Sequence, residues 1–376
     1  MKKVIVIGGG ISGASTAYQL TKLSADVKVT IIDRKDPGQA TDAAAGIICP
    51  WLSQRRNKAW YQLAKKGARF YSQLIARLEK DGEKQTGYKK VGALRIHTDT
   101  NRLAKVEERA EKRRQEAPEI GKLTPLPPQK TRELFPPLAS HFFSLHVEGA
   151  ARVDGRALRD TLLRASQKNG ASFIQGSASL LHQGKKVTGV RVDDKEVIPA
   201  DIVIVCAGAW AKSLLAPLGV NFLGTFQKGQ IVHLQLPDTP TNHWPVIMPP
   251  NDQYMLTLED HRIIVGATHE NDLDHFDTRV TAGGLFEVIQ KALDVAPGLE
   301  HSTLLETRVG FRPYTPGFLP VIGPLPGWDG ILLANGLGAS GLTMGPFIGN
   351  QLAKLALGLE LDIDLSLYDV KGALEP

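Results

Sequence analysis

The sequence predicts an α/β fold in which a discontinuous domain, built on a parallel sheet, carries an inserted domain built on an antiparallel sheet. Three observations lead to this prediction. The chain opens with an apolar run that passes directly into closely spaced glycines. Similar strand and helix patterns return in the middle of the chain and near its C-terminus, and short extended runs lie between them. The 376 residues exceed what one hydrophobic core usually organises, so two domains are expected.

The N-terminal segment has the order of a dinucleotide-binding unit. Val4 to Ile7 predict a buried parallel strand, closely spaced glycines and a helix follow, and a second strand at Val27 to Ile32 ends in Asp33. In such a Rossmann-like unit, glycine backbone approaches a pyrophosphate at the helix N-terminus, and the acid binds the adenosine ribose and repels the 2′-phosphate of NADP. The residues expected along the dinucleotide are Gly8, Gly10, Ile11, Ser12, Gly13, Asp33 and Arg34.

FAD and NAD share this fingerprint, and the segment after the second strand separates them. The segment Ala40-Thr-Asp-Ala-Ala-Ala-Gly-Ile-Ile-Cys-Pro50 is rich in small residues, which let the backbone pass close to a flat ring system. It resembles the ATxAAAG stretch of the D-amino-acid oxidase superfamily of FAD-dependent oxidoreductases, particularly that of glycine oxidase. The resemblance implies FAD as the cofactor, with five residues beside the isoalloxazine: Thr41, Ala44, Ala45, Gly46 and Ile47.

Three later segments match the same superfamily in the same order, so the resemblance covers most of the chain. The first is Ala151 to Asp154, which precedes a helical pattern. In the second, a buried strand at Asp201 to Cys206 runs into Ala-Gly-Ala-Trp, which resembles the flavoprotein ATG-type motif. This motif implies that Ala207 and Gly208 approach FAD.

The third matching segment is a glycine-rich loop near the C-terminus. It runs from Asn335 to Pro346, after a predicted strand at Ile331 to Ala334 and before a helix. By resemblance, its backbone N–H groups and the helix N-terminus face the pyrimidine end of the flavin. There the helix dipole stabilises negative charge that develops as the ring accepts a hydride. The residues implied are Gly338, Ala339, Ser340, Gly341, Leu342 and Thr343.

The sequence between these cofactor segments has antiparallel character. Extended runs at Gln230 to Leu236, Tyr254 to Leu258 and Arg262 to Ala267 predict strands, and Pro-rich residues 118–137 are expected to form a loop. The predicted Rossmann-like FAD-binding domain covers residues 1–85, 150–220 and 307–376. The predicted antiparallel-sheet substrate domain, inserted into it, covers residues 86–149 and 221–306.

Arg312 is the candidate for binding a substrate carboxylate, because a guanidinium fork fixes a carboxylate in direction as well as charge. By resemblance, its motif GFRPYTP presents the carboxylate-binding arginine of glycine oxidase and its relatives; a structural ion pair is the alternative. By resemblance, Tyr254 matches the family's tyrosine on the same carboxylate; a half-buried sheet tyrosine is the alternative. Arg308, two strand periods before Arg312, is either a second positive charge on the same face or an ion-pair partner. His269 is expected to be a surface or core histidine.

The chain departs from glycine oxidase in the C-terminal loop. Glycine oxidase carries a further arginine in a GHFRNG-like loop, whereas this chain has Gly336-Leu-Gly-Ala-Ser-Gly341, which looks more like sarcosine oxidases and D-amino-acid dehydrogenases. Narrow specificity for glycine is therefore in doubt. The two cysteines, Cys49 and Cys206, indicate neither a disulfide nor a metal site. Cys49 does not match the position of the covalent cysteine of sarcosine oxidases, so FAD is expected to be non-covalent.

The resemblance implies an FAD-dependent oxidase of glycine or of small D- or N-methyl amino acids. A hydride passes from Cα to flavin N5, the imino acid hydrolyses, and oxygen is reduced to hydrogen peroxide. No dedicated general base is required when the amine arrives deprotonated. One alternative is a D-amino-acid dehydrogenase that passes electrons to a quinone or other acceptor. Others are an FAD-dependent RNA-modification enzyme and an inert flavoprotein subunit.

Composition agrees with a soluble enzyme. The formal charge is +6 and the isoelectric point is near 9.1, but the basic residues at 54–69 and 102–114 are interleaved as on solvated helix faces, so no nucleic-acid partner is expected. No apolar run approaches the roughly 20 residues that span a bilayer. We expect a cytoplasmic homo-oligomer that acts on a small amino acid.

Overall fold

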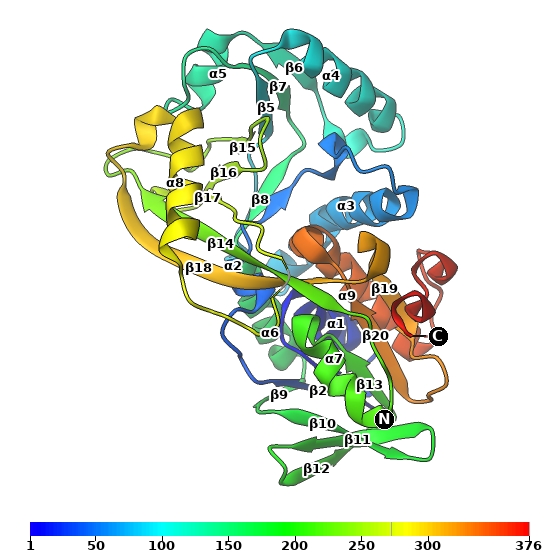
Figure 1. Cartoon of the computed structure of the whole chain (residues 1–376). Helices are drawn as coiled ribbons and strands as arrows, with labels where there is room; N and C mark the ends of the chain where they lie inside the picture. The colour runs from blue at the N-terminus through cyan, green and yellow to red at the C-terminus, as the bar shows by residue number, and fades with distance from the viewer. Residues whose placement is uncertain (272, 376) are drawn as a thin grey trace.

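The computed structural model describes residues 1–271 and 273–375. A six-stranded sheet forms the centre of the lower half of the molecule in Figure 1. Its strands, in sheet order, are β19 (Val321–Pro324), β20 (Ile331–Asn335), β13 (Ile202–Val205), β1 (Lys2–Ile7), β2 (Val27–Asp33) and β9 (Ser172–Gln175). The strands from β20 to β9 run parallel, and β19 is antiparallel to β20. The predicted strand, helix and strand at the N-terminus are thereby confirmed.

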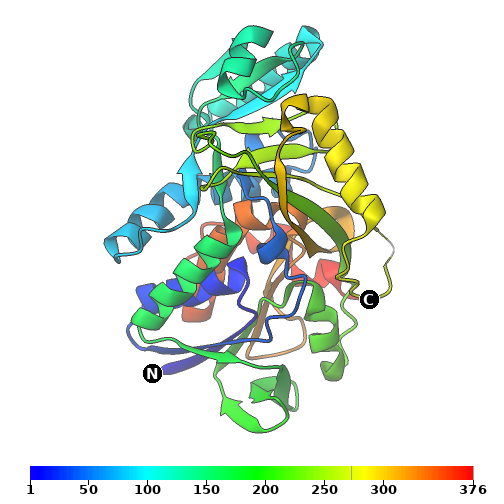
Figure 2. The ribbon, with the colours of Figure 1, turned by 90° about the vertical axis from the view of Figure 1, so that its left-hand side faces the viewer.

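Four long helices pack with this sheet into one hydrophobic core that also reaches the second sheet. They are α1 (Ile11–Leu23), α3 (Lys58–Lys80), α6 (Gly155–Lys168) and α9 (Gly341–Leu357). Helices α1 and α6 lie side by side in Figure 2. Helices α1 and α9 approach closely because Gly349 has no side chain; a β-carbon there would come within 2.6 Å of Cβ of Ser15.

The second sheet has eight strands and is mostly antiparallel. In sheet order they are β18 (Thr303–Tyr314), β14 (Thr225–Gln235), β17 (Arg262–Gly266), β16 (Tyr254–Thr257), β15 (Val246–Met248), β5 (Ala93–His97), β7 (Phe143–Val147) and β6 (Leu123–Leu126). One face packs on helix α8 (Ala282–Val295) in a separate core. Side chains of the other face, such as Ile231 and Leu145, belong to the core shared with α1 and α9. Helix α4 (Thr100–Arg114) packs on this second face.

Two small sheets complete the fold. One joins the large sheets and contains β3 (Ile47–Ile48), β8 (Ala151–Val153) and β4 (Tyr88–Lys90). The other projects at the bottom of Figure 1 and contains β10 (Ala178–Gln183), β11 (Lys186–Val192) and β12 (Glu196–Pro199). Short helices α2 (Ala40–Ala43) and α7 (Ala211–Leu215) follow β2 and β13. Among the described residues, none of the helices is both long and apolar enough to cross a membrane.

The structure corrects the predicted loop at residues 118–137. The segment holds a 3-10 turn at Pro118–Ile120, strand β6, and helix α5 (Pro128–Leu134). Proline stands at the start of both helical pieces, where its missing N–H costs no hydrogen bond. The expected domain boundary at residue 307 falls inside β18, which pairs with β14 along its length. The amphipathic helices expected from the basic stretches are present as α3 and α4.

Candidate active site

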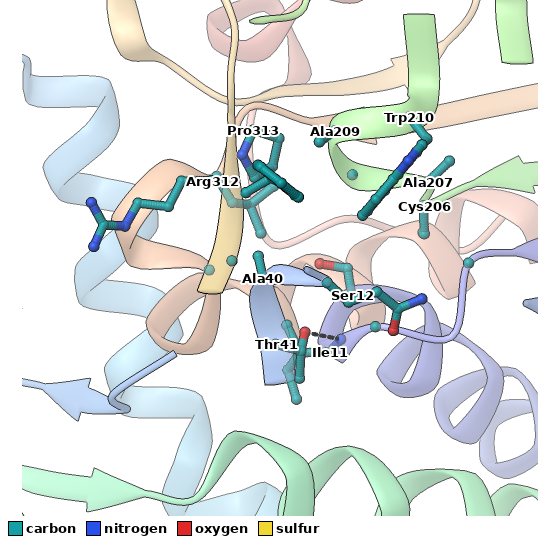
Figure 3. A pocket seen from close by; sticks show the side chains of 18 of the residues that line it. Ile11, Ser12, Ala40, Thr41, Cys206, Ala207, Ala209, Trp210, Arg312 and Pro313 are labelled. Carbon is teal, nitrogen blue, oxygen red and sulfur yellow. Dashed lines mark hydrogen bonds between the residues drawn. The ribbon is translucent and has the colours of Figure 1, made fainter. Parts of the chain in front are cut away.

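A cavity of about 580 Å³ lies between the two large sheets. This volume is in the range of cofactor and substrate pockets. Its walls come from the loop between β1 and α1, the segment after β2, the ends of β13 and β20, and the C-terminal end of β18. The view in Figure 3 shows how these distant segments converge: Ser12 and Thr41 lie below the opening, with Trp210 on one side and Arg312 on the other.

The dinucleotide end of the cavity is organised by Asp33. Its carboxylate accepts hydrogen bonds from the backbone N–H of Gly9, from the N–H of Lys35 at 2.5 Å, and from Nε2 of Gln39 at 2.8 Å. Gly8, with φ of +103°, runs so close to β13 that a β-carbon would lie 2.3 Å from the carbonyl oxygen of Cys206. Only glycine fits such a turn, and the turn brings the backbone against the cavity.

Two helix N-termini open on this one cavity. Helix α1 has Gly10 at its N-cap with no side-chain cap, although the N–H of Ile11 donates to Oγ1 of Thr41 at 3.0 Å (Figure 3). Helix α9 begins at Gly341, and Ser340 at its N-cap makes no side-chain cap hydrogen bond. Uncapped N–H groups and the positive end of the helix dipole favour negative charge. The first end suits a pyrophosphate and the second suits the pyrimidine edge of a reduced flavin.

The small-residue segment lies where the backbone is most crowded. Gly46 has φ of +89°, and a β-carbon there would be 1.7 Å from the carbonyl oxygen of Val153. Oγ1 of Thr343 donates to the carbonyl of Ile47 at 3.1 Å, which joins this segment to the start of α9. These contacts fix a smooth wall of backbone and methyl groups, as a flat ring requires.

The cavity brings together all but two of the residues predicted to contact FAD. Those on its wall are Gly8, Gly10, Ile11, Ser12, Asp33, Arg34, Thr41, Ala44, Ala45, Gly46, Ile47, Ala207, Gly208, Gly338, Ala339, Gly341, Leu342 and Thr343. Gly13 and Ser340 are absent from the wall. Gly13 instead packs behind the loop, where a β-carbon would be 1.8 Å from the carbonyl oxygen of Gly8. Gln39 and Trp210 also line the cavity; neither carries a sequence signal beyond its place next to a predicted motif.

Arg312 reaches the cavity from β18. Its Nη1 donates to Oε1 of Gln227 at 2.8 Å and to the carbonyl of Thr268 at 3.2 Å. Its Nη2 lies over Gly229 of β14. Tyr254, from β16, is on the same wall. Burial raises the pKa of Tyr254, and the adjacent Arg312 opposes that rise, so the phenol is protonated at neutral pH and can donate a hydrogen bond.

The structure does not bring Arg308 to the cavity wall. Its Nη2 pairs with Oε1 of Glu306 at 2.5 Å, and its Nη1 donates to the carbonyl of Asp42 at 3.3 Å. Glu306 also pairs with Arg262 at 2.7 Å. Of the two interpretations of Arg308, the contacts therefore favour the structural ion-pair partner. Its hydrogen bond to Asp42 connects β18 to the short helix α2.

His269 is exposed, in keeping with the expected surface histidine, and it also lies on the cavity wall. Its Nδ1 is 3.7 Å from Oδ2 of Asp252, another wall residue, and Asp252 pairs with Lys291 at 3.0 Å. Burial and the nearby Arg312 lower the pKa of His269, against the opposing charge of Asp252. A neutral imidazole therefore faces the same space as Arg312 and Tyr254.

Neither cysteine has the character of a reactive thiol. Burial raises the pKa of Cys49 and of Cys206 to about 12, so both are protonated at neutral pH. Cys206 lines the cavity beside Gly8, whereas Cys49 is buried behind the wall. Within the described residues, no cluster of His, Cys, Asp and Glu has the arrangement of a metal site.

The chain belongs to the family of FAD dependent oxidoreductases, whose family model matches residues 3–355. It is 61% identical over the whole of both chains to an uncharacterized oxidoreductase, YurR, of Bacillus subtilis. It is 29% identical to glycine oxidase of Pseudomonas putida, over 99% of each chain. The structure of iminodiacetate oxidase from Chelativorans sp. BNC1 is similar, with a TM-score of 0.94, 44% identity, and coverage of 97% of this chain and 98% of that one.

The cofactor of the chain is FAD, and the resemblance to glycine oxidases is confirmed. The residues present fit it: a glycine turn at the N-terminus of α1 for the pyrophosphate, and an uncapped N-terminus of α9 for the flavin edge. The fold is likewise the α/β fold of these oxidoreductases.

Proposed function

We propose that the chain is an amino-acid oxidase acting on glycine or on small D- or N-substituted amino acids. The observation that carries this proposal is the pairing of Arg312 with Tyr254 on the wall of the FAD cavity. A planar guanidinium and a protonated phenol make a carboxylate site with direction, and residues 43–46, which line the same cavity, are three alanines and a glycine. The similar structure is that of an iminodiacetate oxidase, and iminodiacetate is an N-substituted glycine.

The carboxylate site determines which substrate atom meets the cofactor. FAD, when bound, accepts the hydride that leaves Cα. Arg312 and Tyr254 hold the carboxylate on the sheet wall, which leaves the neighbouring Cα to face the cavity. Holding the substrate in one orientation supplies much of the rate enhancement in such a reaction. The positive end of α9 stabilises the negative charge that develops.

His269 has a role in this proposal that the sequence did not suggest. An amino acid in water carries an ammonium group, and a hydride leaves Cα readily only after nitrogen regains its lone pair. The neutral imidazole of His269 accepts that proton, and Asp252 beside it stabilises the resulting cation. The proton then passes to water, because the side chains of His269 and Asp252 are 39% and 49% exposed.

Replacing Arg312 with Leu tests the proposal. We expect the KM for small amino acids to rise at least about a hundredfold, while FAD stays bound and its absorption spectrum is unchanged. The KM of Arg312→Lys should lie between those of the wild type and of Arg312→Leu, because lysine keeps the positive charge and loses the two-pronged guanidinium geometry. An unchanged KM in the leucine variant would remove Arg312 from the substrate site.

The electron acceptor is tested separately. Hydrogen peroxide formed in air, in the amount of imino acid released, supports the oxidase. Turnover only with an added quinone, and no peroxide, supports the dehydrogenase alternative.

A further inference from the structure

Three arginines gather where helix α4 packs against β5 and the 3-10 turn Pro50–Leu52. Arg109 and Arg113 are four residues apart on α4 and so share one face of the helix, and Arg95 comes from β5. We call these three side chains the arginine cluster. Burial lowers the pKa of both Arg95 and Arg113, and in each case the positive charge of Arg109 lowers it further. Arg109 and Arg113 therefore lie on one face of α4, and Arg95 comes from the strand on which that helix packs.

No carboxylate in the described part of the chain forms an ion pair with the arginine cluster. Acids close to it along the chain pair with other residues: Glu108 with Lys112 at 2.7 Å, Glu111 with Arg114 at 2.8 Å, and Glu116 with Lys65 at 2.9 Å. The cluster is held instead by carbonyl groups, which orient guanidinium groups without neutralising them. Arg95 donates to the carbonyl of Pro249 at 2.7 Å, and Arg113 donates to those of Trp51 at 2.6 Å and Ser53 at 2.8 Å.

Four hydrogen-bonding atoms around the cluster are buried with no partner among the described residues. They are Nε and Nη2 of Arg109, Nε1 of Trp51 and the hydroxyl of Tyr61, over whose ring the guanidinium of Arg113 lies at 4.2 Å. Three of the four can only donate. Buried polar groups in native proteins almost always have partners, so a set of donors of this kind indicates a ligand that accepts. Beside three positive charges, the fitting acceptor is an oxyanion.

The strand of Arg95 lies two positions from the strand of Tyr254 in the second sheet, although the cluster itself does not line the FAD cavity. In the sheet, Met248 of β15 is paired with Arg95 of β5. On its other side, β15 runs antiparallel to β16 with Ile247 paired to Met255, so Met248 lies opposite Tyr254. Paired residues point to the same face of a sheet, so Arg95 and Tyr254 share the face that looks toward FAD. Only β15 lies between their strands, a backbone separation of about 10 Å. The segment with Trp51 continues directly from β3 at the flavin wall.

We propose that the arginine cluster is a second anion-binding site, which takes a carboxylate beyond the one held by Arg312 and Tyr254. The carboxylate has two possible sources. The first is the distal group of a substrate that carries two carboxylates, in which case the inference rests on the proposed function. The second is a free carboxylate from solution. Both use the same chemistry, a planar oxyanion against guanidinium and indole donors.

The substrate source is tested with iminodiacetate and sarcosine, which differ by one carboxylate. In the holoenzyme we expect Arg109→Gln to lower the ratio of kcat/KM for iminodiacetate to that for sarcosine at least tenfold. Arg102→Gln is the matched control on the same helix; Arg102 is 72% exposed and 3.8 Å from Asp99, and the ratio should stay within twofold. Arg109→Lys keeps the charge and should recover part of the ratio. It also replaces the glutamine variant if that variant does not fold.

The free-anion source is tested by melting the holoenzyme in increasing acetate at constant ionic strength. A saturable rise of about 2 °C in the wild type and in Arg102→Gln, lost in Arg109→Gln, assigns the site to a free carboxylate. An unchanged ratio together with no saturable acetate effect in the wild type overturns the inference, and leaves the proposed function standing if sarcosine still reduces the flavin. If no amino acid reduces it, the proposed function fails, and the acetate melts alone decide the inference.

Discussion

The guanidinium of Arg312 lies across the backbone of Gly229, where a β-carbon would come within 2.7 Å of Nη2. Gly229 is one strand away on β14 and has no unusual φ, so an alanine there fits the backbone and displaces only the arginine. We predict that Gly229→Ala raises the KM for amino acids about tenfold with FAD fully bound. Steady-state kinetics measure the KM, and the flavin absorption spectrum measures the FAD content. Gly283→Ala is the control, because that glycine has open space around it; equal kinetics in the two variants would refute the role of Gly229.

Asp33 organises the dinucleotide end, and its replacement should release FAD. The carboxylate accepts from Gly9, Lys35 and Gln39, and Asn would turn an NH₂ group toward one of these donors. We expect Asp33→Asn to weaken FAD binding at least about tenfold, because the glycine loop and the ribose both lose an acceptor. The measurement is the flavin content after gel filtration. Asp26→Asn, at an exposed site, should retain full occupancy; equal retention in Asp33→Asn would disprove the assignment.

Activity should depend on the protonation of His269. Burial and Arg312 lower its pKa from 6.5, so the neutral, accepting form prevails at neutral pH and kcat should fall only as the pH drops below 6.5. In His269→Gln the substrate amine must lose its proton without help. We therefore expect kcat to be about a hundredfold lower at pH 7, with the deficit narrowing toward pH 10.

A structural role for His269 would give a deficit that is the same at every pH. The profile is measured from pH 5 to 10, with His301→Gln as the control, since His301 is 89% exposed. A pH-independent deficit, or none, would exclude His269 as the proton acceptor.

His233 should make the fold sensitive to acid. It is fully buried between Arg308 and Glu306, and burial first, then Arg308, lowers its pKa from 6.5 to about 3. Between pH 6.5 and pH 3 this histidine is protonated in the unfolded chain and neutral in the folded chain. The free energy of unfolding therefore falls as the pH falls through this range, by up to about 1.4 kcal/mol per pH unit. His233→Gln should flatten this part of the profile in urea unfolding between pH 8 and 4. Identical slopes for the two proteins would contradict it.

The FAD site was predictable because its signals are local. The glycines after β1, the acid at the end of β2 and the small-residue segment each depend on neighbours close in sequence, and the structure places nearly all of them on one wall. The prolines of residues 118–137 predict a loop, whereas the structure has a strand and two helical pieces there. Proline at the first position of a helical turn starts the element instead of preventing it.

The substrate side was less accessible to sequence reasoning because it depends on strand pairing. The motif favours Arg312, whereas spacing leaves Arg308 as either a second positive charge or an ion-pair partner, and only the structure shows its contact with Glu306. Gly229 has meaning only once β14 is placed beside β18. His269 reaches the cavity through its position next to Arg312 and Asp252, which are contributed by distant parts of the chain.

The role of Arg312 in binding a small amino acid is tested by mixing the purified yellow protein anaerobically with glycine, sarcosine, D-alanine, D-proline and iminodiacetate. We expect at least one of them to bleach the flavin absorbance in the wild type, and the same compound at the same concentration to leave Arg312→Leu largely oxidised. A wild-type flavin that stays oxidised with every compound would contradict it, as would equal bleaching in the two proteins.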